Sequence, residues 1–243
     1  MHPGPSRTPG SLATFGLWLL ALLVCPAMTC PSAPPPPTLP LPDSADPPAS
    51  QELRVQAVGG AGSDEKGSYY AGGALRGSYA PLRGMLVGVE IGGGARHNSP
   101  PRTLPNDRRV DKETAISGRL FVGYGLWLYP QILSLAAEGG LTPGLHSELG
   151  SFLGTDLTIS ATAGGRRLWA LTAGYRLAYM IPSRDSYWSP VLYHLGALTL
   201  QIPRRARYSG FLQLGLHFGH RLPDEEKTLG LQALAGFRFA WGN

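Results

Sequence analysis

The sequence predicts an all-β protein, an antiparallel up-and-down transmembrane β-barrel of about ten strands (eight is the alternative), preceded by a disordered proline-rich segment. Three observations predict this fold. Residues 228–241 alternate apolar side chains with small or polar ones at a period of two. The same two-faced pattern recurs along the chain, and the connections between its segments alternate in length. A barrel surrounded by lipid explains all three, because its strands are apolar outside and polar inside.

The first thirty residues are expected to be a secretion signal. An apolar run at 12–24 follows a weakly basic start and is too short to cross a bilayer as a helix, which takes about 20 residues. Both cysteines, Cys25 and Cys30, lie in this region. Lipidation of Cys30 is an open alternative, although the residues before it form a poor lipidation signal. In either case the exported domain has no pair of cysteines and must be stable without disulfides.

Residues 31–50 are expected to be a disordered periplasmic linker. They contain nine prolines, four of them in an unbroken run at 34–37, and such a segment favours an extended conformation that cannot form a packed core. The remaining residues, 51–243, are enough for one domain, which we expect to be the barrel.

Ten segments are candidate strands, and nine of them have one apolar face and one small or polar face. The segment 187–202 is apolar on both faces, which predicts either a bulge or a locally packed interior. Such a repeat of faces is unexpected in the strands of a soluble protein and favours a barrel in lipid. In chain order the segments are 52–60, 68–80, 84–95, 115–128, 131–141, 156–163, 169–179, 187–202, 208–219 and 228–241.

The connections predict which end of the barrel faces the periplasm. Outer-membrane barrels have short periplasmic turns and longer outer loops. The tight connections are 81–83, 129–130, 164–166 and 203–206, and we assign them to the periplasmic end. The longer or more polar ones, assigned to the outside, are 61–67, 96–114, 142–154, 182–186 and 220–227.

The alternation assigns ten polar side chains to the lumen and seven aromatic ones to the lipid. Unpaired charges in a narrow lumen would be costly, so we expect ion pairs between arginines and carboxylates. The predicted lumen residues are Arg54, Arg76, Glu90, Arg119, Glu138, Asp156, Arg176, Gln213, His217 and Arg238. The predicted lipid-facing aromatic residues are Trp169, Tyr175, Tyr179, Phe218, Phe237, Phe239 and Trp241.

The lumen is expected to be mostly plugged. A barrel of eight strands is just filled by its side chains, and ten strands leave a little more room. Several glycines on inward positions, such as Gly88 and Gly236, would leave further space. The excess of arginine over acidic residues among the predicted lumen side chains then predicts, at most, a narrow path with a weak preference for anions.

The sequence gives little support for an enzyme, a metal-binding protein or a nucleic-acid-binding protein. No serine lies two residues from His217, where a strand would place it for acyl hydrolysis. No spacing typical of metal ligands occurs, and no cofactor is expected. The net charge of +5 comes from arginines that are spread along the chain, so nucleic acid is not an expected partner. An outer-membrane hydrolase is the least favoured alternative.

The segments and the final strand, which ends in Trp241 followed by Gly242 and Asn243, resemble small bacterial outer-membrane β-barrels of OmpA/OmpW-like, porin-like architecture. The resemblance covers about the last 190 residues and includes no family motif. It implies a protein of the bacterial outer membrane with the lipid bilayer as a partner. The leading hypothesis is a structural or interaction anchor, as a subunit of a trans-envelope secretion, polysaccharide-export or motility complex. Its partners would bind the proline-rich segment or loop 96–114; the alternative is a narrow channel for small solutes.

Overall fold

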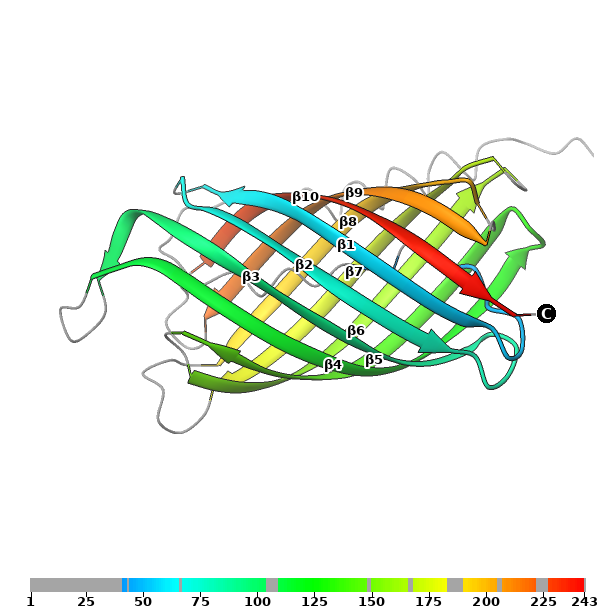
Figure 1. The fold of residues 1–243 in the computed structure, drawn as a ribbon, viewed down its shortest axis with the longest axis horizontal. Helices are drawn as coiled ribbons and strands as arrows, with labels where there is room; N and C mark the ends of the chain where they lie inside the picture. Colours follow the sequence, from blue (N-terminus) through cyan, green and yellow to red (C-terminus); the bar gives the residue numbers. More distant parts are fainter. Residues whose placement is uncertain are drawn as a thin grey trace, which may run out of the picture.

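The computed structural model describes residues 41–242 apart from 43, 66, 104–108, 148–149, 166–167, 183–189, 205–206 and 222–226. The described chain forms ten strands in one closed antiparallel barrel (Figure 1). The prediction of ten strands, in place of eight, is confirmed. The strands are β1 (Leu53–Asp64), β2 (Tyr69–Tyr79), β3 (Met85–Thr103), β4 (Arg109–Tyr129), β5 (Leu133–His146), β6 (Gly150–Gly164), β7 (Ala170–Pro182), β8 (Val191–Ile202), β9 (Tyr208–Arg221) and β10 (Lys227–Trp241).

The barrel is closed by the pairing of its first and last strands. Twelve residues pair without interruption, from Leu53 opposite Trp241 to Asp64 opposite Gly230. A closed barrel has no free sheet edge, and an unpaired edge could not be solvated by lipid. Among the described residues, no helix has the length and hydropathy that crossing a membrane requires.

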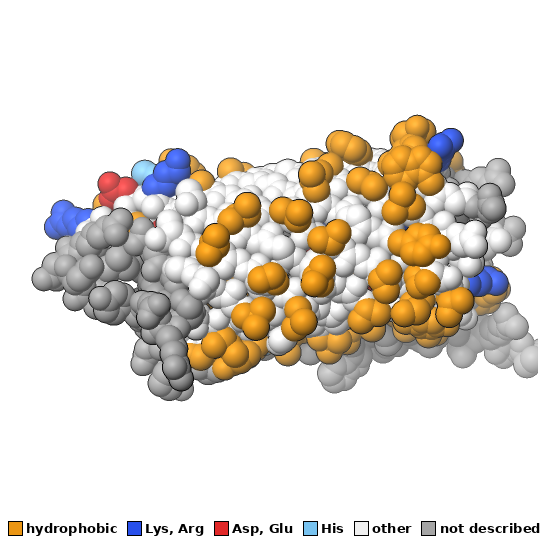
Figure 2. Space-filling model, turned by 60° about the horizontal axis from the view of Figure 1, so that its bottom comes forward, with side chains coloured by type: hydrophobic (Ala, Val, Ile, Leu, Met, Phe, Trp, Pro, Cys, Tyr) orange, Lys and Arg blue, Asp and Glu red, His pale blue; other side chains and the backbone are white. Residues whose placement is uncertain are grey.

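The outer wall of the barrel is apolar. Every strand contributes exposed large apolar side chains, for example Leu75 in β2, Leu120 in β4 and Leu214 in β9, each more than 60% exposed. Figure 2 shows apolar side chains along the whole visible wall, with charged side chains only near its two ends. Exposing so large an apolar surface to water would be unfavourable, whereas the acyl chains of a bilayer match it. The protein is therefore an outer-membrane β-barrel.

The seven aromatic residues assigned to the lipid are exposed or half-buried. Trp169, Tyr175, Phe237 and Trp241 are exposed, and the other three are half-buried. Phe239 lies between Tyr208 and Trp241, with its ring centre 4.3 Å from that of Tyr208. These three rings lie at the end of the barrel where β10 finishes, as expected for an aromatic girdle at a membrane interface.

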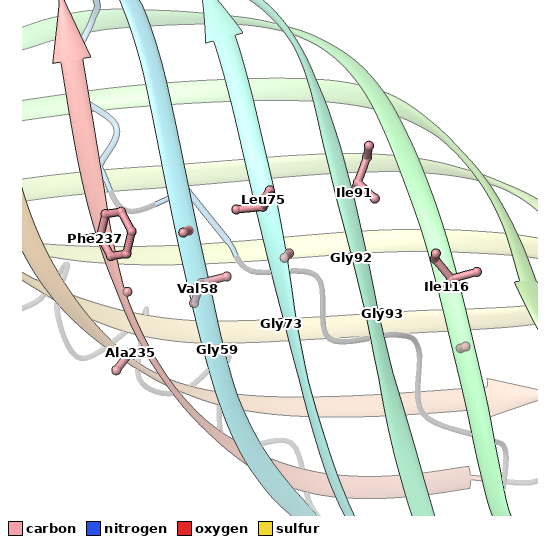
Figure 3. A pocket seen from close by; sticks show the side chains of 14 residues that line it. Val58, Gly59, Gly73, Leu75, Ile91, Gly92, Gly93, Ile116, Ala235 and Phe237 are labelled. Atoms are coloured by element: carbon pink, nitrogen blue, oxygen red, sulfur yellow. The ribbon is translucent and has the colours of Figure 1, made fainter.

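A shallow depression interrupts the outer wall across β10, β1, β2, β3 and β4. Figure 3 shows Gly59, Gly73 and Gly93 along its floor, with larger apolar side chains such as Leu75 and Phe237 beside them. The three glycines face one another directly in the strand register. Its volume is about 550 Å³, and its position on the lipid-facing side means that acyl chains of the bilayer fill it.

Two long segments that were predicted to be outer loops are largely strand, and so are residues 61–64 of the predicted short loop 61–67. The hairpin of β3 and β4 includes most of the predicted loop 96–114 and leaves only 104–108 between the strands, and β5 and β6 leave only 147–149 of 142–154. Arg96 pairs opposite Glu113 and His97 opposite Lys112. The β3–β4 hairpin projects beyond the other strands (Figure 1). Outside the membrane neither face of a hairpin needs to be apolar, so the two-faced pattern that identified strands is lost there.

Strand β8 settles the choice between a bulge and a packed interior. Its register with β7 and with β9 runs without a shift, so the bulge is absent. Its inward side chains Val191, Tyr193 and Leu195 are buried in apolar clusters, and the packed interior is confirmed. The register shifts instead between His97 and Arg102 in β3, and at the end of β4.

Candidate functional site in the barrel lumen

Large inward side chains are seated against glycines of the neighbouring strand. Phe121 lies opposite Gly88, and Phe211 lies opposite Gly236. A Cβ atom added at either glycine would stand 2.5 Å from the tip of the facing ring. These glycines therefore admit aromatic side chains into the lumen, and the space that they leave at these two positions is filled by Phe121 and Phe211.

Arg119 is the centre of an ion-pair network in the middle of the lumen. Its side chain is completely buried. Its Nη2 and Nε atoms donate to the two carboxylate oxygens of Asp156 at 2.5 and 2.8 Å, and its Nη1 donates to Glu138 at 3.2 Å. Glu90 lies 3.8 Å from the same Nη1. Two parallel bonds to one carboxylate hold the guanidinium in a single orientation.

Arg76 and Arg176 complete this network. Arg76 donates to Glu138 at 2.5 Å, and its guanidinium lies 4.0 Å from the ring centre of Phe121. Arg176 lies 3.9 Å from Asp156. Three arginines and three carboxylates, all six of them predicted from the sequence, thus lie together with no net formal charge. Such compensation is what buried charges need in order to be tolerated.

The other four predicted lumen residues are buried but lie apart from the network. His217 Nδ1 is 3.1 Å from the hydroxyl of Tyr70, which donates to a backbone carbonyl of β10 at 2.9 Å. Arg54 and Arg238 lie near the end of the barrel with the tight turns. Gln213 donates to Thr199 at 2.8 Å and also binds the N-terminal part of the chain, described below.

A second polar cluster lies toward the outer end of the lumen, and none of its members was predicted. Arg96 donates to Asp64 and, at 3.4 Å, to Ser68, while Asn98 donates to Glu113 at 3.0 Å. All five side chains are buried. The period-two pattern of β3 continues through Arg96 and Asn98, so following it beyond residue 95 would have identified both.

An N-terminal strap, defined here as residues 41–50, enters the lumen from the end with the tight turns. The backbone N–H and C=O of Leu41 bind the side-chain amide of Gln213 at 3.2 and 3.3 Å. The N–H of Ala45 donates to Thr162 Oγ1 at 2.6 Å. The sequence predicts a solvated linker here, and the structure differs because lumen side chains satisfy the few backbone donors that the prolines leave. The barrel unit therefore begins before residue 51.

Asp46 ties the strap to the barrel wall. Its carboxylate accepts hydrogen bonds from Arg204 Nη2 at 2.7 Å, from Arg204 Nε at 3.0 Å and from the hydroxyl of Ser134 at 2.9 Å. Its backbone carbonyl accepts from Arg54 at 3.2 Å. Arg204 is almost completely buried and also donates to the carbonyl of Gly164 at 2.8 Å. The strap is thus joined to β1, β5 and two of the tight turns.

Glu52 holds the bend by which the strap leads into β1. It pairs with Arg54 at 2.6 Å and accepts the N–H of Ala49 at 2.8 Å. Burial raises the pKa of the Glu52 carboxyl, but the neighbouring arginines Arg54 and Arg238 and the hydrogen bonds lower it further, to below its ordinary value. The ionised carboxylate is therefore the form that the bend stabilises.

Inside the described lumen seven arginines are matched by seven carboxylates, and the exposed Arg83 and Arg207 at its mouth come in addition. The sequence led to an expected excess of arginine because it missed four acidic residues: Asp46, Glu52, Asp64 and Glu113. The weak preference of a narrow path for anions stays a prediction. Within the described residues, no group of three or more histidine, cysteine, aspartate or glutamate side chains is placed to hold a metal ion.

Comparison with known proteins does not assign the chain to a family. No family model and no curated protein matches the chain. Solved structures that are similar include Neisserial surface protein A (8% identity, 77% of this chain and 95% of that one, TM-score 0.36) and the β-domain of the Bordetella autotransporter BrkA (12%, 78% and 99%, TM-score 0.43). The outer-membrane protease OmpT of Escherichia coli is also similar (9%, 82% and 100%, TM-score 0.38). At these scores the matches add nothing to the barrel that the strand order already establishes.

Proposed function

We propose that the protein is a closed outer-membrane barrel that acts as a structural or interaction anchor and does not conduct solutes by diffusion. The observation that carries the proposal is the content of the lumen. The network around Arg119 occupies its middle, and the strap occupies the part next to the tight turns. A wall of ten strands would leave some free room if side chains alone filled it, and the strap takes up that room.

An anchor needs a surface that a partner can bind, and two parts of the chain are suited to this. The first is the projecting β3–β4 hairpin, whose outer described residues include the exposed Asp111 and Lys112. The second is the proline-rich stretch 31–40, which directly precedes the strap. A trans-envelope complex for secretion, polysaccharide export or motility would use such contacts on one or both sides of the membrane. We propose no catalytic residue, because the buried His217 is bonded to Tyr70 and lies in a closed lumen.

The conduction part of the proposal is tested in planar bilayers. The full-length protein should give no stable conductance steps, because the strap and the network around Arg119 occupy successive parts of the lumen. Steps as large as those of a general porin would contradict the proposal. Folding is checked separately by the shift in gel mobility on heating, which a closed hydrogen-bonded barrel produces.

The anchor part is tested by two separate changes that leave the strap in place. One variant lacks residues 31–40, and the other carries Asp111→Ala and Lys112→Ala on the hairpin. Each is expressed in cells, and native gels of mildly solubilised outer membranes are compared with wild type. Loss of a larger complex in either variant, with the heat-modifiable barrel retained, is the expected result. An absence of any larger complex in wild type, or a complex unchanged in both variants, would contradict the anchor.

A narrow channel is the second candidate, and one observation favours it. The strap is not a strand of the barrel, and it is held in the lumen by a few hydrogen bonds of Leu41, Ala45 and Asp46, so loss of those of Asp46 would favour its withdrawal. Conductance steps in Asp46→Asn but not in wild type would favour a channel gated by the strap.

A further inference from the structure

A cavity of about 770 Å³ lies at the mouth of the barrel beside the tight turns, between the strap and the wall. The short turns and the C-terminus mark this end as the periplasmic one (Figure 1). The cavity has strap residues on one side and basic and aromatic side chains on the other. Those that matter below are Arg54, Arg83, Arg207, Arg238, Trp127 and Trp241.

The carboxylates of this cavity are already engaged. Asp46 is bound by Arg204 with two hydrogen bonds, and Glu52 is bound by Arg54 at 2.6 Å. By contrast, Arg83 and Arg207 are exposed. Neither has a carboxylate partner among the residues that the structure describes.

The charge of the cavity points to the class of its ligand. Four arginines and two carboxylates line it, so its formal charge is +2. A phosphomonoester carries a charge of about −1.5 to −2 at neutral pH, which matches this excess. Guanidinium groups offer planar pairs of donors that fit phosphate oxygens, and the two indole rings provide apolar surface for the rest of a ligand.

We propose that the periplasmic mouth is a binding site for a phosphate-bearing ligand, held by Arg83 and Arg207. The same chemistry is already present beside the mouth, because Arg54 holds the carboxylate of Glu52 and the neighbouring buried Arg204 holds that of Asp46. A ligand there would lie against the strap and cover the closed end of the lumen. The phosphate could come from a soluble periplasmic compound or from a lipid headgroup of the inner leaflet, since Trp241 lies at the wall as well as at the mouth.

The test uses the full-length protein folded in a phosphate-free maltoside detergent, with inorganic pyrophosphate as the probe in a calorimetric titration. Wild type should bind one pyrophosphate saturably, and the affinity should fall as salt is added. The double variant Arg83→Gln, Arg207→Gln should bind about tenfold more weakly or worse, because charge-assisted contacts are lost. Both side chains are exposed, so the heat-modifiable fold should be kept.

The matched control is Arg109→Gln, an exposed arginine at the opposite end of the barrel. It should bind pyrophosphate as wild type does. An absence of saturable binding to wild type overturns the proposal. So does equal weakening in the Arg109 variant, because the effect would then reflect overall charge and not the mouth.

A second arm distinguishes the sources of the phosphate. The same titration is repeated in nanodiscs of neutral lipid and in nanodiscs that contain phosphatidylglycerol. Weaker pyrophosphate binding in the phosphatidylglycerol nanodiscs, absent in the double variant, identifies a lipid headgroup that competes for Arg83 and Arg207. Equal binding in both identifies a soluble ligand.

Discussion

Removing the guanidinium of Arg119 should destabilise the barrel more than any exposed substitution. In Arg119→Met, three buried carboxylates keep only two arginines as partners. The lost contacts are two hydrogen bonds to Asp156, one to Glu138 at 3.2 Å and the approach to Glu90 at 3.8 Å. Breaking a buried ion pair from one side costs about 3–5 kcal/mol, because a charge is left uncompensated. We expect a loss of about that size.

The cause can be separated from a general packing effect by a second substitution. Asp156→Asn, added to Arg119→Met, restores equal numbers of positive and negative charges in the network while leaving the shape of the side chain. If uncompensated charge is the main cost, the double variant should regain at least half of the lost stability. Packing loss alone would give no recovery, since Asn fills no more volume than Asp.

Urea-induced unfolding of the protein in lipid vesicles, followed by tryptophan fluorescence, measures these differences by linear extrapolation. Arg109→Met is the control, because Arg109 is exposed and should change the free energy of unfolding by less than about 0.5 kcal/mol. A loss below about 1 kcal/mol in Arg119→Met, or a double variant no more stable than the single one, would refute the reasoning.

Three further predictions follow from the fit of the lumen. Gly88→Val should destabilise the barrel by about 1–3 kcal/mol or more, because its Cβ would meet an aromatic ring at 2.5 Å. Gly77→Ala is the control and should be neutral, since a Cβ there meets nothing within 4 Å. The temperature of the heat-induced gel shift measures the stability of both variants. Asp46→Asn should free the strap, seen as faster cleavage of the strap by added protease while the barrel stays intact. The pKa of Glu52 is lowered by Arg54 despite burial, so their pairing should stabilise the bend above about pH 4.5 and be lost as the pH falls through the lowered value. Protease cleavage of the strap in wild type relative to Glu52→Gln, followed as the pH is lowered, tests this, and a ratio of rates that never changes would contradict it.

The facing of the strands could be predicted from the sequence because lipid and lumen impose opposite demands on alternate residues. That is why Arg76, Arg119 and Glu138, from three different strands, were assigned to one interior before any contact between them was known. The prediction from sequence failed for residues beyond the membrane, where alternate side chains no longer face lipid and lumen. Beyond the membrane both faces of a hairpin can be polar, and Arg96 and Glu113 were therefore assigned to a loop although they pair across two strands.

The strap could not be predicted, for a different reason. Its contacts join residues far apart in the chain, such as Leu41 with Gln213 and Asp46 with Arg204. Nothing in a proline-rich segment signals such partners, because the pattern shows only that the segment forms no regular structure of its own.

The strap and the inward glycines both affect how the space inside the barrel is filled. A ten-stranded wall encloses more space than inward side chains of ordinary size fill, and an unfilled interior would admit water or collapse. At Gly88 the neighbouring strand supplies a ring, but at Gly174 and Gly125 the strap supplies the filling. A Cβ at Gly174 would lie 3.1 Å from Leu41 and one at Gly125 would lie 3.2 Å from Pro47. Glycine at these two positions thus makes room for the strap, so the wall and the strap fit together as one unit and this part of the lumen is filled by the chain itself.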